Sequence, residues 1–398
     1  MMVAVWHSLA VLPGSGVKAD IIASIRRLTN GNAAVTLFFV LSGFVLGLSL
    51  RKAGACTGQR YLGFCVRRFF RIYPVFLFAT LLVVAGLYYS HYTGGLFPSW
   101  FNSASHYRQT ELDPSRPPSA ALVLGNLLLW CPTLNYPTWT LGIELRCSLL
   151  LPLLYWWSGR LSGRGKGLLL LALMLAACLG KWCLLLGSPA AEAIVALFIS
   201  GFAGCLFLFY LGYLLPEAGP VIFEKLKASR SASRLLPWAP AVVWLWSESW
   251  GDEFRLLQGT AAAMLIGHLL YGGEERPWRM LDHPLARFYG RISFSFYLWH
   301  DLILVVTART LLHFAPMAAR PDSSLLWRAP LLLASIGLTT GLAILCYKFI
   351  ERPCIDYGKR LTGKLFPAVA STENHPRMLA GPETAPCFLE ATAKDRAA

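Results

Sequence analysis

The first residue of this 398-residue chain that is suited to chemistry is His7, which stands in the apolar stretch 3–9. An ionisable side chain inside such a stretch is costly to bury and needs a reason to be there. An imidazole titrates close to neutral pH, so it can act as a general base on a hydroxyl or as a transient acyl carrier. The alternative is a histidine hydrogen-bonded to a neighbouring helix, and the local sequence favours neither reading.

A carboxylate lies deep in another apolar segment. Glu144 comes about two helical turns after the start of that segment at residues 137–138. At this depth it must be protonated, paired with a cation or hydrogen-bonded to an imidazole. Arg146 is only two residues away and does not face it on a helix. The sequence therefore predicts a partner on another helix, and His7 is expected at a similar depth on the same side.

Two arginines stand before a third apolar run. Arg68 and Arg71 are three residues apart and are predicted to share one face of a helix. The guanidinium fork matches phosphate oxygens, so the pair is a candidate phosphate-binding site. The alternative is that the basic cluster is a topogenic signal and a contact for lipid headgroups.

The dipeptide His300-Asp301 is the fourth polar feature, and it stands inside the apolar stretch 292–314. Burial of these two side chains is costly unless they face a cavity or have polar partners inside the protein. They are equally compatible with a polar network that only fixes helix packing.

The composition shows what kind of structure must position these residues. The chain is 56% hydrophobic and 14% charged, with a mean hydropathy of +0.51, which is too apolar for a water-soluble globular protein. A polytopic membrane protein is predicted, and disordered, collagen-like and disulfide-rich secreted chains are excluded. The net charge of +15 does not indicate nucleic-acid binding, because the basic residues lie between apolar segments. The ten cysteines form no C-x-x-C pair, so no structural metal site is expected.

Apolar runs of membrane-spanning length recur along the chain. The predicted fold is therefore an all-α transmembrane bundle of about ten spans, in which the first span is short and looks truncated. The ten predicted spans are residues 1–13, 33–50, 72–90, 139–157, 168–187, 193–215, 236–247, 256–272, 292–314 and 327–350. A shorter apolar stretch, residues 120–131, is interpreted as re-entrant or interfacial.

Lysine and arginine in the loops predict the sidedness. The segments 51–71 and 160–166 are basic and are expected to be cytoplasmic, whereas the loop 91–138 is balanced. With ten spans, both termini are then cytoplasmic. The last residues, 354–398, are polar and are interpreted as a disordered cytoplasmic tail. The sequence does not indicate which membrane holds the protein.

Five sequence motifs, taken together and in this order, resemble the membrane acyltransferase 3 family, most closely its fungal branch. The resemblance covers residues 1–353. Its motifs are residues 37–46 (LFFVLSGFVL), 67–74 (RRFFRIYP), 139–144 (WTLGIE), 292–300 (ISFSFYLWH) and 351–353 (ERP).

The resemblance implies transfer of an acyl group, often acetyl, from acyl-CoA to a hydroxyl of a sugar, a lipid or a small metabolite. In that family His7 matches the catalytic histidine of the first span. Arg68 and Arg71 match the arginines that hold the phosphates of coenzyme A, and Glu144 supports the reacting centre. Acyl-CoA is then a donor substrate, and no tightly bound cofactor is expected.

The same resemblance marks His300 as a further catalytic candidate. Four other positions belong to the family motifs without an assigned role: Ser42, Trp139, Tyr297 and Glu351. The loop 91–138 either shapes the acceptor site or covers the bundle, and the acceptor, the acyl chain length and the oligomeric state stay open.

One departure from the family concerns the first span. The family carries an arginine about ten residues before its histidine, and only six residues precede His7 here. We therefore expect the natural start to lie upstream of Met1. Two other functions remain open, a transporter or flippase and an inactive remnant of the acyltransferase scaffold.

Overall fold

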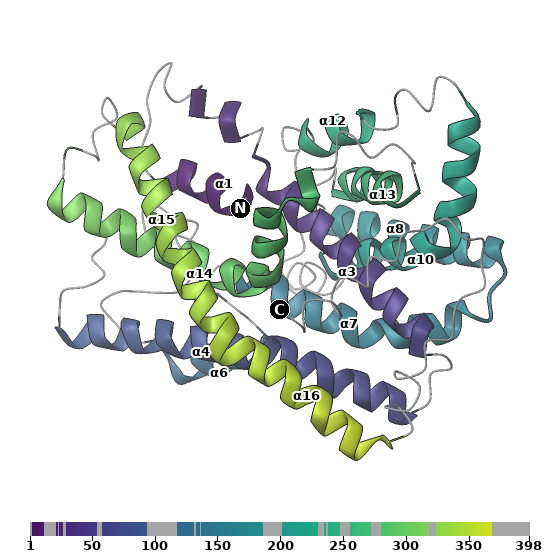
Figure 1. The fold of residues 1–398 in the computed structure, drawn as a ribbon, viewed down its shortest axis with the longest axis horizontal. Coiled ribbons are helices and arrows are strands. Elements are labelled where there is room, and N and C mark those ends of the chain that lie inside the picture. The colour runs from purple at the N-terminus through teal and green to yellow at the C-terminus, as the bar shows by residue number, and fades with distance from the viewer. Residues whose placement is uncertain are drawn as a thin grey trace.

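The computed structural model describes residues 2–11, 21–22, 24–26, 29–53, 58–93, 118–130, 133–135, 137–185, 201–229, 235, 238–246, 255–271, 280–315, 317 and 324–367. Every regular element within these residues is a helix (Figure 1). The prediction of an all-α protein is therefore confirmed for the part of the chain that the structure describes.

The helices follow the apolar runs, because a helix satisfies its backbone hydrogen bonds within its own segment, as a lipid environment requires. Their bounds are α1 (Met2–Val11), α3 (Gly31–Ala53), α4 (Gly58–Thr93), α6 (Ala120–Leu127), α7 (Thr138–Ser158), α8 (Gly163–Leu185), α10 (Gly201–Ala228), α12 (Ala239–Trp246), α13 (Arg255–Tyr271), α14 (Pro284–Phe314), α15 (Ser324–Cys346), a π-helical turn (Tyr347–Glu351) and α16 (Arg352–Leu365).

Each of the ten predicted spans overlaps one of these helices, but the count of ten spans is not confirmed. Four helical stretches within the described residues are long and apolar enough to cross a membrane: Ser24–Lys52, Gly58–Tyr89, Phe202–Ala228 and Leu326–Leu365. They fit an integral membrane protein, in agreement with the prediction. Exposed leucines along α15, such as Leu326, Leu333 and Leu338, are the kind of surface that faces lipid.

The basic segment 51–71 differs from the prediction of a loop. Helix α4 already begins at Gly58, and its 36 residues extend over about 54 Å, against a hydrocarbon core of about 30 Å. Arginine, glutamine and leucine are good helix formers, so the helix continues past the apolar run into its polar flank. The arginine pair lies on this helix, as its three-residue spacing predicted.

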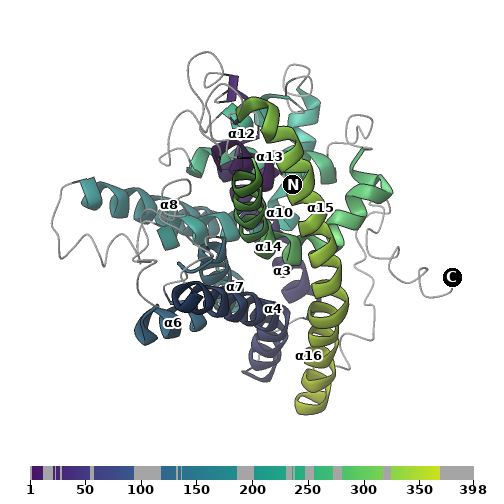
Figure 2. The ribbon, with the colours of Figure 1, turned by 90° about the vertical axis from the view of Figure 1, so that its left-hand side faces the viewer.

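Helix α16 is a second difference, because the folded part was predicted to end at Pro353. The chain continues as a basic amphipathic helix to Leu365 and packs against α4. Gly358 lies against Phe70, and Thr362 lies against Gly63, so the small residues let the two helices approach closely. Figure 2 shows α15 and α16 as one continuous rod with α14 beside it. The predicted tail beyond residue 367 lies outside the described residues.

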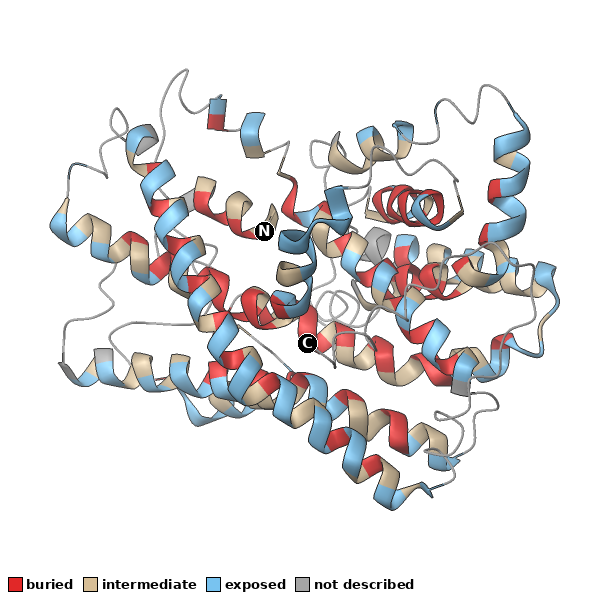
Figure 3. Ribbon diagram, viewed as in Figure 1, coloured by how far each residue is buried: buried red, intermediate tan, exposed pale blue. Residues whose placement is uncertain are grey.

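One side of the bundle, the packed half, consists of α3, α10 and α13 together with the adjoining faces of α7 and α8. Helices α3 and α10 meet at two glycines. A Cβ added at Gly43 would lie 2.0 Å from the backbone oxygen of Phe209, and one added at Gly212 would lie 1.9 Å from that of Val40. Only glycine permits this backbone approach, which is how helices gain packing contacts in a bilayer. Figure 3 shows α13 buried along most of its length.

The other side, the polar half, consists of α1, α4, α14 and α15, and α7 lies between the two halves. Its apolar clusters are smaller and centre on Phe76, Trp299 and Phe296. Buried polar side chains are interspersed among them. This half holds most of the residues that the sequence singled out.

Candidate functional site

The imidazoles of His7 on α1 and His300 on α14 lie side by side, with ring centroids 5.5 Å apart. Both residues are buried. Asp301 follows on α14, and its Oδ1 lies 3.8 Å from His7 Nδ1. The indole of Trp6 contacts the same imidazole edge-on, with centroids 5.0 Å apart. The structure thus brings the two predicted catalytic histidines together and adds a carboxylate.

The orientation of His300 follows from its own helix. Its Nδ1 lies 2.6 Å from the carbonyl oxygen of Tyr297, and because a carbonyl only accepts, Nδ1 carries the proton. The other nitrogen, Nε2, is then a lone-pair acceptor. It is buried and has no hydrogen-bond partner among the described residues. This imidazole is therefore equipped to receive a proton from a group that enters the site.

A cavity of about 10 Å³ adjoins His300, between α1, α14 and α15. This volume is enough for about one water molecule. A larger group fits there only if the surrounding helices move apart. Its lining includes Ala4, Phe296, Leu304, Ser335 and Thr339.

Hydrogen bonds connect α14 to α7 next to the histidines. The Thr140 hydroxyl donates to the Tyr297 hydroxyl at 2.9 Å, and the Asn135 amide donates to the Leu298 carbonyl at 3.1 Å. Of the predicted motif residues, Tyr297 contributes this bond, and Trp139 is half-buried on α7 next to Thr140. The contact fixes the turn of α14 that presents His300.

Glu144 has a different partner from the one that the sequence suggested. Its Oε1 accepts a hydrogen bond from Arg68 Nη2 at 2.6 Å, and the same nitrogen donates to Ser148 at 2.9 Å. Both charged side chains are buried. The expectation of a partner on another helix is confirmed, but that partner is Arg68 on α4 and not His7. A buried charge is stabilised by an opposite charge with good geometry, which the arginine fork supplies.

These contacts form a row of polar side chains, the polar line, which runs from α1 across α14 to α7 and α4. Thr140, Glu144 and Ser148 are four residues apart and share one face of α7. All members except the half-buried Tyr297 are buried. The polar line comprises His7, Asp301, His300, Tyr297, Thr140, Glu144, Ser148 and Arg68.

The two arginines of the predicted phosphate site have different environments. Arg71 is exposed on α4, whereas Arg68 is buried and bound to Glu144. Arg71 is within electrostatic reach of Glu351, a buried carboxylate that accepts a hydrogen bond from Ser295 at 2.6 Å. The predicted motif residue Glu351 thus joins the end of α15 to α14.

Ser42 lies apart from these contacts. It is half-buried on α3, beside Gly43 at the close approach to α10. Within the described part of the chain, no hydrogen bond of its side chain is found. Its motif is accounted for by helix packing, because the neighbouring glycine is what the α3–α10 contact requires.

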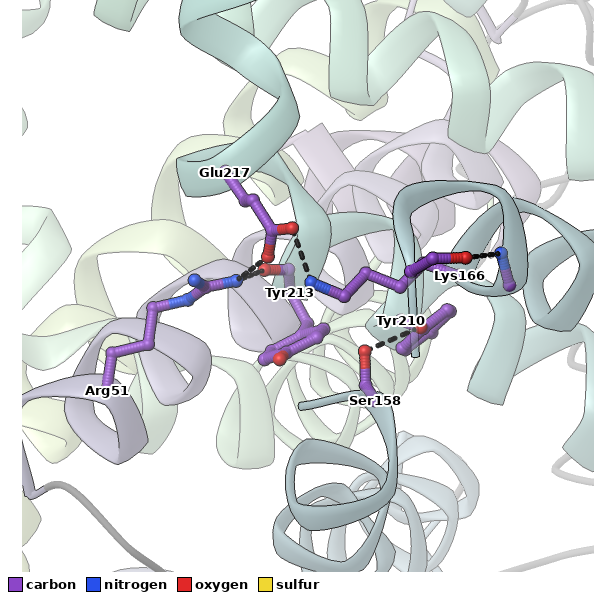
Figure 4. A network of polar contacts seen from close by, with 8 residues as sticks. Arg51, Ser158, Lys166, Tyr210, Tyr213 and Glu217 are labelled. Carbon is purple, nitrogen blue, oxygen red and sulfur yellow. Dashed lines mark hydrogen bonds and ion pairs between the residues drawn. The ribbon is translucent and has the colours of Figure 1, made fainter. Parts of the chain in front are cut away.

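A second polar cluster lies in the packed half. Glu217 on α10 receives hydrogen bonds from Arg51 on α3, at 3.2 Å, and from Lys166 on α8 (Figure 4). The Arg51 guanidinium also lies over the Tyr213 ring, 4.9 Å from its centroid. The carboxylate is 39% exposed at its side chain, so water reaches this cluster. It connects α3, α8 and α10 and is separate from the polar line.

Sequence reasoning missed three members of the polar line as site residues, namely Asp301, Thr140 and Ser148. A signal for two of them was present, because Thr140 and Ser148 lie one turn before and one turn after Glu144 and so form a polar stripe on an apolar helix. Asp301 was recognised as a buried charge, but its neighbour on α1 is visible only in the fold.

Comparison with known proteins identifies the family of the chain. No curated protein and no solved structure gave a match. The profile of the acyltransferase domain matches residues 1–348, which is most of the chain and includes α1, α4, α7, α14 and α15. The match thus covers every helix that contributes to the polar line. The chain therefore belongs to the acyltransferase 3 family.

Proposed function

We propose that the protein is an integral-membrane O-acyltransferase that moves an acyl group, acetyl in the simplest case, from acyl-CoA to an acceptor hydroxyl. The observation that carries the proposal is the buried contact between His7 and His300 within a chain of this family. A buried imidazole next to a cavity is what general-base catalysis on a hydroxyl needs. Exclusion of water from such a site protects the thioester from hydrolysis.

In the proposed reaction His7 is the catalytic base. Its imidazole removes the proton of the acceptor hydroxyl as the oxygen bonds to the thioester carbonyl carbon. The carbon–sulfur bond then breaks, and the imidazolium returns the proton to the coenzyme A sulfur. The ring of His300 lies 5.5 Å from that of His7, lines the adjoining cavity and supplies a second proton-accepting nitrogen.

The donor is proposed to approach from the arginine end of the polar line. Arg71 is exposed and is the better placed of the two arginines to bind a coenzyme A phosphate. Arg68 is occupied by Glu144 and binds phosphate only if that ion pair opens. We propose that this end faces the cytoplasm, where acyl-CoA is available, in line with the positive charge of α4 and α16.

The test uses the full chain in lipid nanodiscs with radiolabelled acetyl-CoA and a panel of hydroxyl acceptors. His7→Ala is compared with His313→Ala, which removes an exposed histidine of α14 outside the site. The expected result is label transfer or coenzyme A release by the native protein and the control, and a loss of at least about 100-fold in His7→Ala.

A folded, monodisperse native protein that consumes no acyl-CoA of any chain length would refute the proposed function. Solute uptake into proteoliposomes under the same conditions would then support the transporter instead.

A further inference from the structure

The contact between His7 and Asp301 is the structural basis of a further assignment. The two groups come from different helices, α1 and α14, and face each other at 3.8 Å from Nδ1 to Oδ1. Their side chains are only 8% and 6% exposed. A carboxylate so deep in an apolar bundle is costly unless it has a proton-bearing or cationic partner. An imidazole N–H directed at it supplies such a partner.

The neighbouring histidine is held differently. His300 Nδ1 is bound by the carbonyl of Tyr297 in its own helix, so the ring needs no carboxylate to fix it. His7 is instead packed edge-on against Trp6 and lies beside the His300 ring. Two titratable side chains of α14 thus face His7. Asp301 is the acidic one, and His300 is the other.

We propose that Asp301 is a positioning residue for His7: its carboxylate accepts a hydrogen bond from Nδ1–H and so turns Nε2 toward the acceptor hydroxyl. The assignment deepens the proposed acyl transfer and rests on it. The 3.8 Å separation is longer than a hydrogen bond, and such bonds in sites without substrate commonly tighten when substrate binds. The carboxylate of Asp301 also stabilises the imidazolium that forms when Nε2 takes the hydroxyl proton.

The protonation pattern of His7 can be measured without any turnover. Full-length protein carrying ¹⁵N-histidine in nanodiscs gives separate NMR signals for Nδ1 and Nε2, and the His7 pair is assigned from its absence in His7→Gln. The native protein is expected to show His7 with its proton on Nδ1. In Asp301→Ala the proton moves to Nε2, which is the usual preference of a free imidazole. An unchanged His7 pattern in Asp301→Ala overturns the proposal.

Activity gives the second readout. Asp301→Asn is expected to lower kcat by about 100-fold, while KM for acyl-CoA changes by less than about threefold. The kcat of Asp301→Glu is expected to be at least about tenfold higher than that of Asp301→Asn. Thr307→Val is the matched control, since this hydroxyl lies on the same helix and bonds only its own backbone, to Ile303. A purely structural role predicts that kcat falls equally in Asp301→Asn and Asp301→Glu and that both variants have a lower thermal midpoint. That result also overturns the assignment.

The two proposals fail in different ways. If the native protein turns over no acyl-CoA but the His7 signals move in Asp301→Ala, the acyl transfer is wrong and the positioning contact stands. If turnover is seen and Asp301→Asn retains it, the positioning role is wrong and the acyl transfer stands.

Discussion

The two halves of the bundle achieve stability by different means. In the packed half, glycines bring α3 and α10 so close that backbone touches backbone. In the polar half, side-chain hydrogen bonds and the buried Arg68–Glu144 ion pair join α4, α7 and α14. The His7–Asp301 contact joins α1 to α14, and a small cavity remains. Lipid competes with protein for apolar surface, so helices associate through close packing and polar contacts. We therefore expect the packed half to be more rigid than the half that holds the polar line.

The largest loss of stability is expected when the buried ion pair of the polar half is broken. Arg68→Ala leaves the buried Glu144 without its cationic partner, which costs about 3 kcal/mol of unfolding free energy. The double variant Arg68→Met/Glu144→Leu restores most of the stability but none of the acyl transfer. Chemical unfolding in detergent measures the first quantity and label transfer the second. Equal stability of the single and double variants would show that this half does not depend on charge pairing.

A smaller loss of stability is expected when the packed half is altered. Gly212→Ala places a Cβ against the backbone oxygen of Val40 and costs about 1–3 kcal/mol. Gly337→Ala on α15 is the matched control, because nothing lies within 4 Å of its added Cβ. Thermal midpoints compare the two variants. The molecules of Gly212→Ala that remain folded should keep the native KM, and a raised KM would contradict the separation between scaffold and site.

A still smaller change in stability is expected at the junction of α14 and α7. Tyr297→Phe removes the acceptor of the Thr140 hydroxyl and costs about 0.6 kcal/mol. Because this contact fixes the turn that carries His300, the rate of acyl transfer should fall by more than the stability loss alone explains. Parallel assays of kcat and thermal midpoint decide this. A proportionate fall in both would make Tyr297 a packing residue only.

The smallest effect is expected at the exposed cluster of the packed half. Glu217→Gln breaks its ion pairs with Arg51 and Lys166, yet solvent-exposed pairs contribute about 0–1 kcal/mol. The difference from the native protein should shrink further as salt is raised. Unfolding in low and high salt tests this point. A loss as large as that of Arg68→Ala would mean that the cluster is a structural anchor of the scaffold.

Much of the helical content could be predicted, because an apolar run in lipid has few alternatives to a helix. The extents of the helices were less predictable. Helices α4 and α14 begin before their apolar runs, at Gly58 and Pro284, where helix-forming polar residues prolong them. The number of spans does not follow from the sequence either, since length and hydropathy do not distinguish a span from a buried helix of the bundle.

The site was predictable as a set of residues and not as a set of contacts. His7 and His300 stood out because a polar group in an apolar run is rare. Their mutual contact, and the pairing of Glu144 with Arg68, depend on how helices far apart in sequence pack together. A single sequence holds no record of that packing, and Asp301 was therefore recognised as a charge without a role.

The π-helical turn Tyr347–Glu351 has a consequence for how the chain tolerates change in length. A π turn accommodates one more residue than an α turn, so it shifts the angular phase of everything that follows by about 100°. Upstream of it α15 packs along α14, and downstream Gly358 of α16 faces Phe70 of α4. Deletion of one residue within the turn would swing α16 away from α4 while leaving both helices intact. Any compensating insertion must fall before Gly358, because geometry fixes the number of residues between these two contacts.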